Sequence, residues 1–339
     1  MQQYNSHIII PTEDRLVDTF NRQYFYLRLS ITDVCNFKCN YCLPNGYQPP
    51  SDKRMFLSVV EIERLVRAFA RLGTEKVRIT GGEPTLRKDF LPIVEAIRQQ
   101  QNIKKIALTT NGYRMAKDVA AWKAAGVDSI NVSVDSLDPR LFHLITGENK
   151  LADILQGIGK AFAVGYDKIK VNAVLMKNLN EQGFNEFLHW VKEQPIQMRF
   201  IELMQTGDMD HFFAKHHLSG AILKQKLLDA GWQLQHKHHT DGPAQVFKHP
   251  DYVGEIGLIM PYEKDFCASC NRLRVSAQGK LHLCLFGEEG IDIRQWLQDD
   301  DQQFELQQAL ITALQGKREH HFLHQGDSGI RNHLASIGG

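Results

Sequence analysis

Apolar, strand-like runs alternate with helical segments in the first two thirds of the chain, with a repeat of roughly 30 residues. The expected strands are 24–31, 77–80, 103–108, 129–134, 168–175 and 197–203, and the expected helices are 58–72, 90–99, 117–125, 151–164 and 184–191. Parallel strands need a crossover helix between them, so this alternation predicts a parallel sheet. Six units fall short of a closed α/β barrel, and the periodicity does not distinguish a partial barrel from an open, doubly wound sheet.

Polar or glycine-bearing stretches follow five of these six strands. The first strand leads into a cysteine loop, and the later stretches are Gly81-Gly82-Glu83-Pro84, Thr109-Thr110-Asn111-Gly112, Ser133-Val134-Asp135 and Glu202-Leu203-Met204. In α/β barrels the chemistry lies at the carboxyl ends of the strands. We therefore expect one site on this rim, where Gly81 and Gly82 would let a ligand approach the backbone.

All six cysteines fall into two triplets, with spacings C-x3-C-x2-C and C-x2-C-x13-C. These are Cys35, Cys39 and Cys42, then Cys267, Cys270 and Cys284. Grouped thiols favour metal ligation in a reducing compartment over a disulfide framework. Each triplet lacks the fourth thiolate of a closed site, which leaves a coordination position for a small molecule. The alternatives are apolar packing or a zinc knuckle for the first triplet, and a zinc ribbon with His282 for the second.

The last third of the chain differs in composition. A histidine-bearing stretch at 236–242, which is more typical of a solvated loop than of a metal site, predicts a division into 1–240 and 241–339. A strand pair is expected within 252–260. Strands at 273–276 and 280–284 flank a turn at 277–279, and this hairpin would return Cys284 beside Cys270 with Arg272 and Arg274 on one face.

Charge and length narrow the function classes. The chain has 339 residues, 43% of them hydrophobic, and a net charge of +1. No overall electrostatic field therefore favours binding to nucleic acid or to a membrane. No leader peptide or transmembrane run is evident, and we expect a cytoplasmic protein. No P-loop motif is present. Basic residues within the expected strands instead suggest a pocket for a polyanion: Arg28, Lys76, Arg78, Lys170 and Arg199.

The first cysteine loop, with Tyr41 before its last cysteine, and the motif Gly81-Gly82-Glu83-Pro84 resemble those of radical S-adenosylmethionine enzymes. The resemblance implies an incomplete (β/α)6 barrel whose open side is closed by a C-terminal α+β extension. It implies a [4Fe-4S] cluster on the first triplet, where reductive cleavage of S-adenosylmethionine yields a 5′-deoxyadenosyl radical. The implied S-adenosylmethionine contacts are Tyr41, Gly82, Ser133 and Met204.

The motif at 266–274 and the terminal Gly338-Gly339 make the resemblance more specific. With them, nearly the whole chain resembles the branch of these enzymes that cyclises GTP for molybdenum cofactor biosynthesis. A second [4Fe-4S] cluster on the second triplet would bind guanine. The radical would abstract H3′, and C3′ would attack C8. Implied GTP contacts are Arg28, Lys76, Arg78, Thr109, Lys170, Arg199, Arg272, Leu273 and Arg274. Implied catalytic residues are Arg28, Arg272, Arg274, Gly338 and Gly339, with the glycine tail inserted into the cavity.

The resemblance also implies partners: GTP, a flavodoxin- or ferredoxin-like electron donor, and a downstream cyclic pyranopterin monophosphate synthase. Neither nucleic acid nor membrane is expected, and the protein would be a monomer or homodimer. Two other functions are compatible with the residues alone. One is a different radical S-adenosylmethionine enzyme with an auxiliary cluster, such as a peptide maturase. The other is a zinc-stapled binding module.

Overall fold

The fold is built on one long sheet. The computed structural model describes residues 15–49, 55–205, 209–287, 290–326 and 337. The strands of the first two thirds are β1 (Tyr26–Ser30), β2 (Lys76–Thr80), β3 (Lys105–Thr110), β4 (Ser129–Ser133), β5 (Ile169–Leu175) and β6 (Ile196–Glu202). Those of the last third are β7 (Gln233–Leu234), β8 (Gln245–Lys248), β9 (Glu255–Ile259), β10 (Arg272–Val275), β11 (Lys280–His282) and β12 (Ile291–Asp292).

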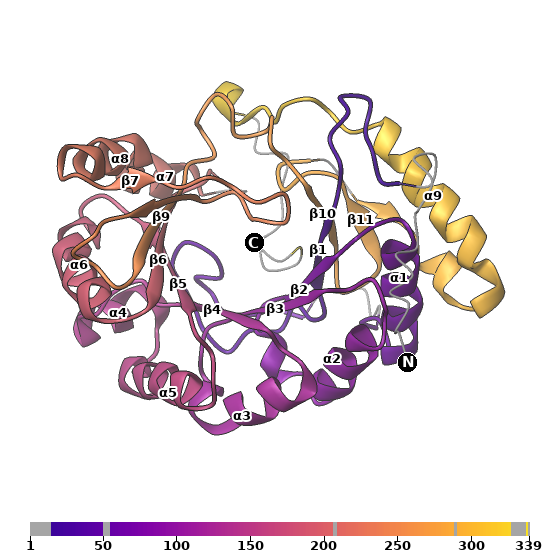
Figure 1. Cartoon of the computed structure of the whole chain (residues 1–339), viewed down its shortest axis with the longest axis horizontal. Helices are drawn as coiled ribbons and strands as arrows, with labels where there is room; N and C mark the ends of the chain where they lie inside the picture. Colours follow the sequence, from indigo (N-terminus) through magenta and orange to yellow (C-terminus); the bar gives the residue numbers. More distant parts are fainter. Residues whose placement is uncertain (1–14, 50–54, 206–208, 288–289, 327–336, 338–339) are drawn as a thin grey trace, which may run out of the picture.

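The sheet order is β12-β11-β10-β1-β2-β3-β4-β5-β6-β9-β8-β7. The strands from β10 through β1 to β6 and β9 pair in parallel, whereas the outer ones are antiparallel. Figure 1 shows these strands following one another around an arc, with the helices on its outer side. The predicted parallel sheet and partial barrel are thus confirmed, and the open, doubly wound alternative is not.

Helices lie in the connections between the parallel strands, and a further helix follows the last strand. They are α1 (Val59–Arg71), α2 (Phe90–Arg98), α3 (Met115–Ala125), α4 (Pro139–Thr146), α5 (Leu151–Ala163), α6 (Phe184–Glu193), α7 (Asp210–His216), α8 (Gly220–Asp229) and α9 (Gln303–Gln315). Ser58 caps α1, as predicted: its hydroxyl accepts from the Glu61 amide at 3.2 Å, and the Glu61 carboxylate accepts from the Ser58 amide at 2.8 Å. Among the described residues, no helix is both long and apolar enough to span a bilayer.

Two sequence predictions are corrected. The third strand covers Lys105–Thr110 rather than 103–108, so Thr109 belongs to the strand and not to the loop after it. Only one strand, β9, lies within 252–260, and its antiparallel partner is the earlier β8. The expected hairpin of β10 and β11 is present, with Arg274 opposite His282.

Strand alternation divides the arc into two faces. The apolar residues of β1 and β2, such as Leu27 and Val77, are fully buried in the core. Their neighbours Arg28 and Arg78 are polar and line a cavity. A side chain every second residue points to the same face, so the concave side collects the charged residues of successive strands. This explains basic residues inside otherwise apolar strands.

The C-terminal part closes the open side of the arc. Strand β9 pairs with β6 at one end and β10 with β1 at the other. The connection between them, residues 260–271, therefore crosses from one end of the barrel to the other, and it carries Cys267 and Cys270. This confirms the closing role of the C-terminal extension. The division at residue 240 stays a prediction.

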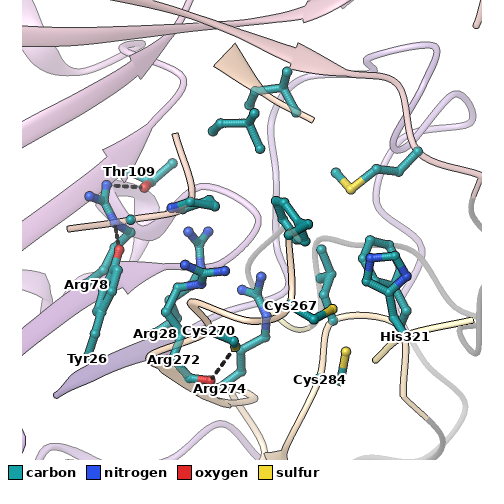
Figure 2. Close-up of a pocket in the computed structure, with 18 of the residues that line it drawn as sticks. Tyr26, Arg28, Arg78, Thr109, Cys267, Cys270, Arg272, Arg274, Cys284 and His321 are labelled. Carbon is teal, nitrogen blue, oxygen red and sulfur yellow. Dashed lines mark hydrogen bonds between the residues drawn. The ribbon is translucent and has the colours of Figure 1, made fainter. Parts of the chain in front are cut away.

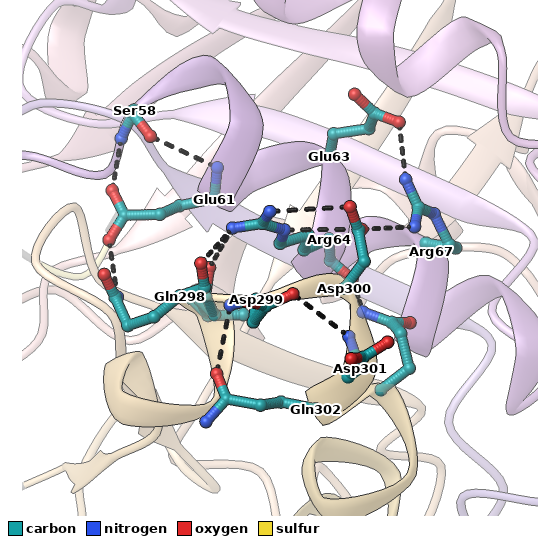
Figure 3. A network of polar contacts seen from close by, with 12 residues as sticks. Ser58, Glu61, Glu63, Arg64, Arg67, Gln298, Asp299, Asp300, Asp301 and Gln302 are labelled. Atoms are coloured by element: carbon teal, nitrogen blue, oxygen red, sulfur yellow. Dashed lines mark hydrogen bonds and ion pairs between the residues drawn. The ribbon is translucent and has the colours of Figure 1, made fainter.

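The C-terminal segment is also fastened to α1 by a polar network (Figure 3). Arg294 pairs with the Glu61 carboxylate at 2.7 Å. The Asp300 carboxylate forms ion pairs with Arg64, at an N···O distance of 3.3 Å, and with Arg67, at 2.8 Å. Glu61 therefore joins the first helix cap to the C-terminal part of the chain. Surface pairs of this kind contribute little individually, but Gln298, which donates to Glu61 and accepts from Arg64, links them into one network.

Candidate active site

Two cavities on the concave face are continuous. One, of about 1150 Å³ including its open mouth, is lined by the first cysteine triplet. The other, of about 1020 Å³, is lined by the second triplet. Thr109, Asn172, Ile201 and Met204 line both. The two triplets therefore open into one space, which we call the chamber. Its size suits two ligands of nucleotide dimensions.

The first cysteine loop is held by backbone contacts with the end of α4. The amides of Lys38 and Asn40 donate to the carbonyls of Thr146 and Ile145, each at 3.0 Å. The Tyr41 hydroxyl donates to Asp135 at 2.8 Å. Helix α4 was not predicted, although Asp138 before Pro139 is a helix-start signal and Asp138 does cap it. The loop is thus positioned by β4 and α4 together.

The glycine pair after β2 packs tightly against the cysteine loop. A Cβ on Gly82 would lie 2.4 Å from the Val34 carbonyl oxygen and 2.6 Å from that of Asp33. Glu83 is fully buried and accepts hydrogen bonds from Thr85, Thr110 and the Asn111 amide. Most of its acceptor capacity is therefore used within the protein. The glutamate fixes the ends of β2 and β3, and the glycines allow their contact with the loop.

The cysteines of the first triplet are half-buried and line the chamber. Burial raises the pKa of Cys35 to about 11 and that of Cys39 well above its ordinary value. The cysteines of both triplets are free thiols without disulfides. Among the residues described, no three His, Cys, Asp or Glu side chains converge on one point suited to a single metal ion. An iron–sulfur cluster spreads its thiolate ligands over separate irons, so a wider triplet fits it.

The second triplet faces a wall of arginines. Arg28, Arg272 and Arg274 line the same cavity as Cys267, Cys270 and Cys284 (Figure 2). Burial opposes ionisation of Cys270, but the charges of Arg272 and Lys317 outweigh it and lower the pKa of this thiol. No carboxylate is among the described residues that line this half of the chamber. Three thiols in an electropositive wall are a donor set suited to an anionic cluster and an anionic ligand.

The strands contribute further cations. Arg78 donates from Nη1 to Thr109 Oγ1 at 3.0 Å, and Lys76 donates from Nζ to the Thr240 carbonyl at 2.9 Å. Burial, together with neighbouring arginines and lysines, lowers the pKa of Lys170 to about 5. Burial and the Arg78 charge lower the pKa of Arg199 to about 10. Buried cations that repel one another in this way favour the binding of a polyanion.

Arg199 joins the chamber to a side pocket that also contains Lys170. Its Nε donates to Gln197 Oε1 at 2.7 Å, and Gln197 Nε2 donates to Glu255 at 2.5 Å. Glu255 in turn pairs with Lys168 at 2.7 Å and with Lys248 at 3.2 Å. This chain of contacts holds the Arg199 guanidinium in place.

Most residues proposed from the sequence do meet in this space. Tyr41, Gly82, Ser133 and Met204 line its first half. Arg28, Arg78, Thr109, Arg199, Arg272 and Arg274 line its second half, and Lys170 lines the side pocket. Lys76 is buried beneath. The Leu273 side chain is buried in the apolar core, and Leu273 lines neither half of the chamber nor the side pocket. Gly338 and Gly339 lie outside the described residues, whereas Ile337 before them is buried.

Several lining residues were missed by the sequence analysis: Tyr26, Asn131 and Asn172 in the chamber and Gln197 in the side pocket. Each lies in or directly after a strand. The available signal was a polar residue at alternate strand positions, which is equally typical of a solvent-facing strand. Only the closure of the arc decides that these side chains face a chamber.

These features define the radical SAM class of partial barrels. The profile of the Radical SAM superfamily matches residues 29–191, and the Molybdenum Cofactor Synthesis C profile matches residues 196–323. The solved structure of Streptococcus suis SuiB bound to S-adenosylmethionine has a TM-score of 0.63 over 87% of this chain and 68% of its own, at 15% identity. At this identity the likeness concerns the fold.

Sequence relatives are more specific. GTP 3′,8-cyclase of Pasteurella multocida (strain Pm70) is 72% identical over 96% of this chain and 97% of its own length. GTP 3′,8-cyclase of Haemophilus influenzae (strain ATCC 51907 / DSM 11121 / KW20 / Rd) is 70% identical over the same shares. The chain therefore belongs to the GTP 3′,8-cyclase family. This membership disfavours both the zinc-stapled module and the peptide maturase.

Proposed function

We propose that the chain converts GTP to (8S)-3′,8-cyclo-7,8-dihydroguanosine 5′-triphosphate, the first step of molybdenum cofactor biosynthesis. The observation that carries this proposal is the chamber: one thiol triplet lines each of its halves, and arginines line the half with the second triplet. Such a space can hold two small molecules in contact, which is the requirement for hydrogen transfer between them.

The first triplet would hold one [4Fe-4S] cluster and the second triplet another. When bound, the clusters and S-adenosylmethionine supply a 5′-deoxyadenosyl radical and an iron with a vacant coordination position. The chain provides Gly82 and Met204 beside S-adenosylmethionine, with Tyr41 and Ser133 on the same side. Their placement in the first half of the chamber supports these roles.

On the nucleotide side, Arg28, Arg272 and Arg274 would surround the base, with the Leu273 backbone between them. Lys76, Arg78, Lys170 and Arg199 would hold the triphosphate, and Thr109 would contact the nucleotide between them. Guanidinium groups keep their charge and pair with phosphate in a fixed geometry. Buried as they are, the same groups would stabilise negative charge that develops on the base as the ring closes.

The terminal Gly338 and Gly339 would complete the chamber, since glycines add no side chain to a space already filled by substrate. Deleting both should abolish turnover and leave about eight irons per chain, as two cubanes require. Full turnover by the truncated protein would refute this role.

The proposed reaction also requires partners. An electron donor of the flavodoxin or ferredoxin type would reduce the first cluster. The cyclised triphosphate would pass to cyclic pyranopterin monophosphate synthase.

The proposed function is tested by anaerobic incubation with S-adenosylmethionine, a reductant and GTP deuterated at C3′. Deuterium recovered in 5′-deoxyadenosine would identify both the substrate and the position of hydrogen abstraction. Formation of 5′-deoxyadenosine without label from GTP would refute the proposal.

A further inference from the structure

The side-chain carbonyl oxygens of two asparagines on neighbouring strands lack hydrogen-bond partners in the described structure. Asn131 lies on β4 and Asn172 on β5, and within the described structure the side-chain carbonyl oxygen of each is buried and unpaired. Asn131 is only 4% exposed and lines the half with the second cysteine triplet. Asn172 lines both halves. Buried polar groups are normally paired, so these amides point to a ligand that supplies the missing donors.

The chemistry of the surrounding wall narrows the choice of ligand group. Arg78 and Arg199, which line the same half, carry only donors. They can pair with phosphate oxygens, which are acceptors. An asparagine carbonyl needs a donor instead, and a nucleotide offers donors on its ribose hydroxyls and on the base. The Asn131 carbonyl oxygen is therefore suited to a donor group on the ribose or the base, whereas the arginines are suited to the phosphates.

Strand register places Asn131 between a residue of the chamber and a residue of the side pocket. It is opposite Thr109 on β3 and opposite Lys170 on β5. Thr109 lines both halves of the chamber, and Lys170 lies in the cationic side pocket. In the proposed function the triphosphate is held from both sides of Asn131, by Arg78 on β2 and by Lys170 and Arg199 on β5 and β6. The ribose is the part of the nucleotide that adjoins the phosphates and carries hydroxyl donors, so it is the group that Asn131 is placed to meet.

We propose that the Asn131 side chain hydrogen-bonds a ribose hydroxyl of the nucleotide and thereby selects a ribonucleoside triphosphate over a deoxy analogue. This proposal rests on the proposed function, because it takes the nucleotide site from there. Asn172, which faces both halves, is positioned to contact either ligand and is not required for the selection.

The test compares equilibrium binding of GTP, 2′-deoxyGTP and 3′-deoxyGTP to the holoenzyme with both clusters and without S-adenosylmethionine, so that no turnover occurs. We expect the wild-type protein to bind GTP about tenfold more tightly than one of the two analogues, the value for one hydrogen bond of ordinary strength. Asn131→Ala should weaken GTP binding by the same factor and cause no further loss with that analogue.

Ser129→Ala is the matched control. Ser129 lies on the same strand and also has a buried, unpaired side-chain oxygen, but it lines neither half of the chamber nor the side pocket. It should leave all three dissociation constants unchanged, with unchanged iron content.

Equal weakening of all three nucleotides by Asn131→Ala would overturn the proposal. Equal affinity of the wild-type protein for all three would do so as well, and this comparison needs no variant. If the wild-type holoenzyme binds GTP but shows no preference, only the present proposal fails. If it does not bind GTP at all, the proposed function fails with it.

Discussion

The guanidinium of Arg78 is held by the hydroxyl of Tyr26, which accepts a hydrogen bond from Arg78 Nε. The same guanidinium donates to Thr109, and the Lys76 ammonium lies 4.5 Å from the centre of the Tyr26 ring. Burial disfavours ionisation of this phenol, but the charges of Arg78, Lys76 and Arg28 outweigh it and lower the pKa of Tyr26 to about 6. The tyrosine thus acts as a counter-ion within the cationic wall.

Replacing Tyr26 by phenylalanine should weaken GTP binding. The ring and its contact with Lys76 remain, but Arg78 loses the partner of its Nε and keeps only the hydrogen bond to Thr109. A hydrogen bond to a charged group contributes about 1.5–3 kcal/mol, so we expect a rise of roughly tenfold to a hundredfold in the dissociation constant for GTP. S-adenosylmethionine binding is the internal control and should not change. Unaltered affinity for GTP would show that Tyr26 does not position Arg78.

The same variant tests the pH dependence of stability. Above pH 6 folded Tyr26 is ionised, whereas in the unfolded chain it stays protonated up to about pH 10. The unfolded state therefore binds more protons between these values, and the free energy of unfolding rises with pH. This stabilisation is complete above about pH 10 and is lost as the pH falls through about 6. The difference between wild type and Tyr26→Phe in denaturant titrations should grow over this range; a constant difference would contradict an ionised phenol.

Nucleotide binding should be accompanied by proton uptake. Lys170 has a pKa of about 5 in the free protein, because of burial and the charges of Arg199, Arg78 and Lys76. Phosphate groups beside it would raise that pKa, so near neutral pH GTP should bind with uptake of up to about one proton at this site. Calorimetry in buffers of different ionisation enthalpy measures the uptake. Lys170→Met should reduce it, and the same uptake in that variant would assign the proton elsewhere.

A methyl group on Gly82 should displace the cysteine loop. The added Cβ would meet the Val34 and Asp33 carbonyl oxygens at less than the contact distance, and both residues lie in the backbone just before Cys35. We expect Gly82→Ala to bind S-adenosylmethionine weakly and to lose the first cluster, leaving about four irons per chain.

Gly159→Ala is the control for that variant. Gly159 lies within α5, where an added Cβ meets nothing within 4 Å. Its iron content should be normal, and its stability should increase by up to about 1 kcal/mol because alanine favours helix. Normal iron and ligand binding in Gly82→Ala would show that the loop tolerates displacement.

The sequence predicted the parts of the molecule that depend on local pattern. The parallel sheet, the Ser58 cap and the hairpin after Arg272 follow from periodicity and turn chemistry. The pairing of β10 with β1 and of β9 with β6 is different, because it joins distant parts of the chain. That pairing sets which face of each strand is enclosed. Asn131 and Tyr26 were missed for this reason. The sequence shows that they occupy alternate positions in a strand, but it does not show that this face of the strand is enclosed.

The most direct test of the chamber is spectroscopic. We would prepare two variants anaerobically, one with Cys35, Cys39 and Cys42 replaced by alanine and one with Cys267, Cys270 and Cys284 replaced. Electron paramagnetic resonance of the reduced proteins would then be recorded with each ligand. The wild-type protein should contain about eight irons and each variant about four. We expect S-adenosylmethionine to change only the spectrum of the first triplet's cluster, and GTP only that of the second. Both ligands acting on one cluster, or about four irons in the wild-type protein, would contradict the central claim.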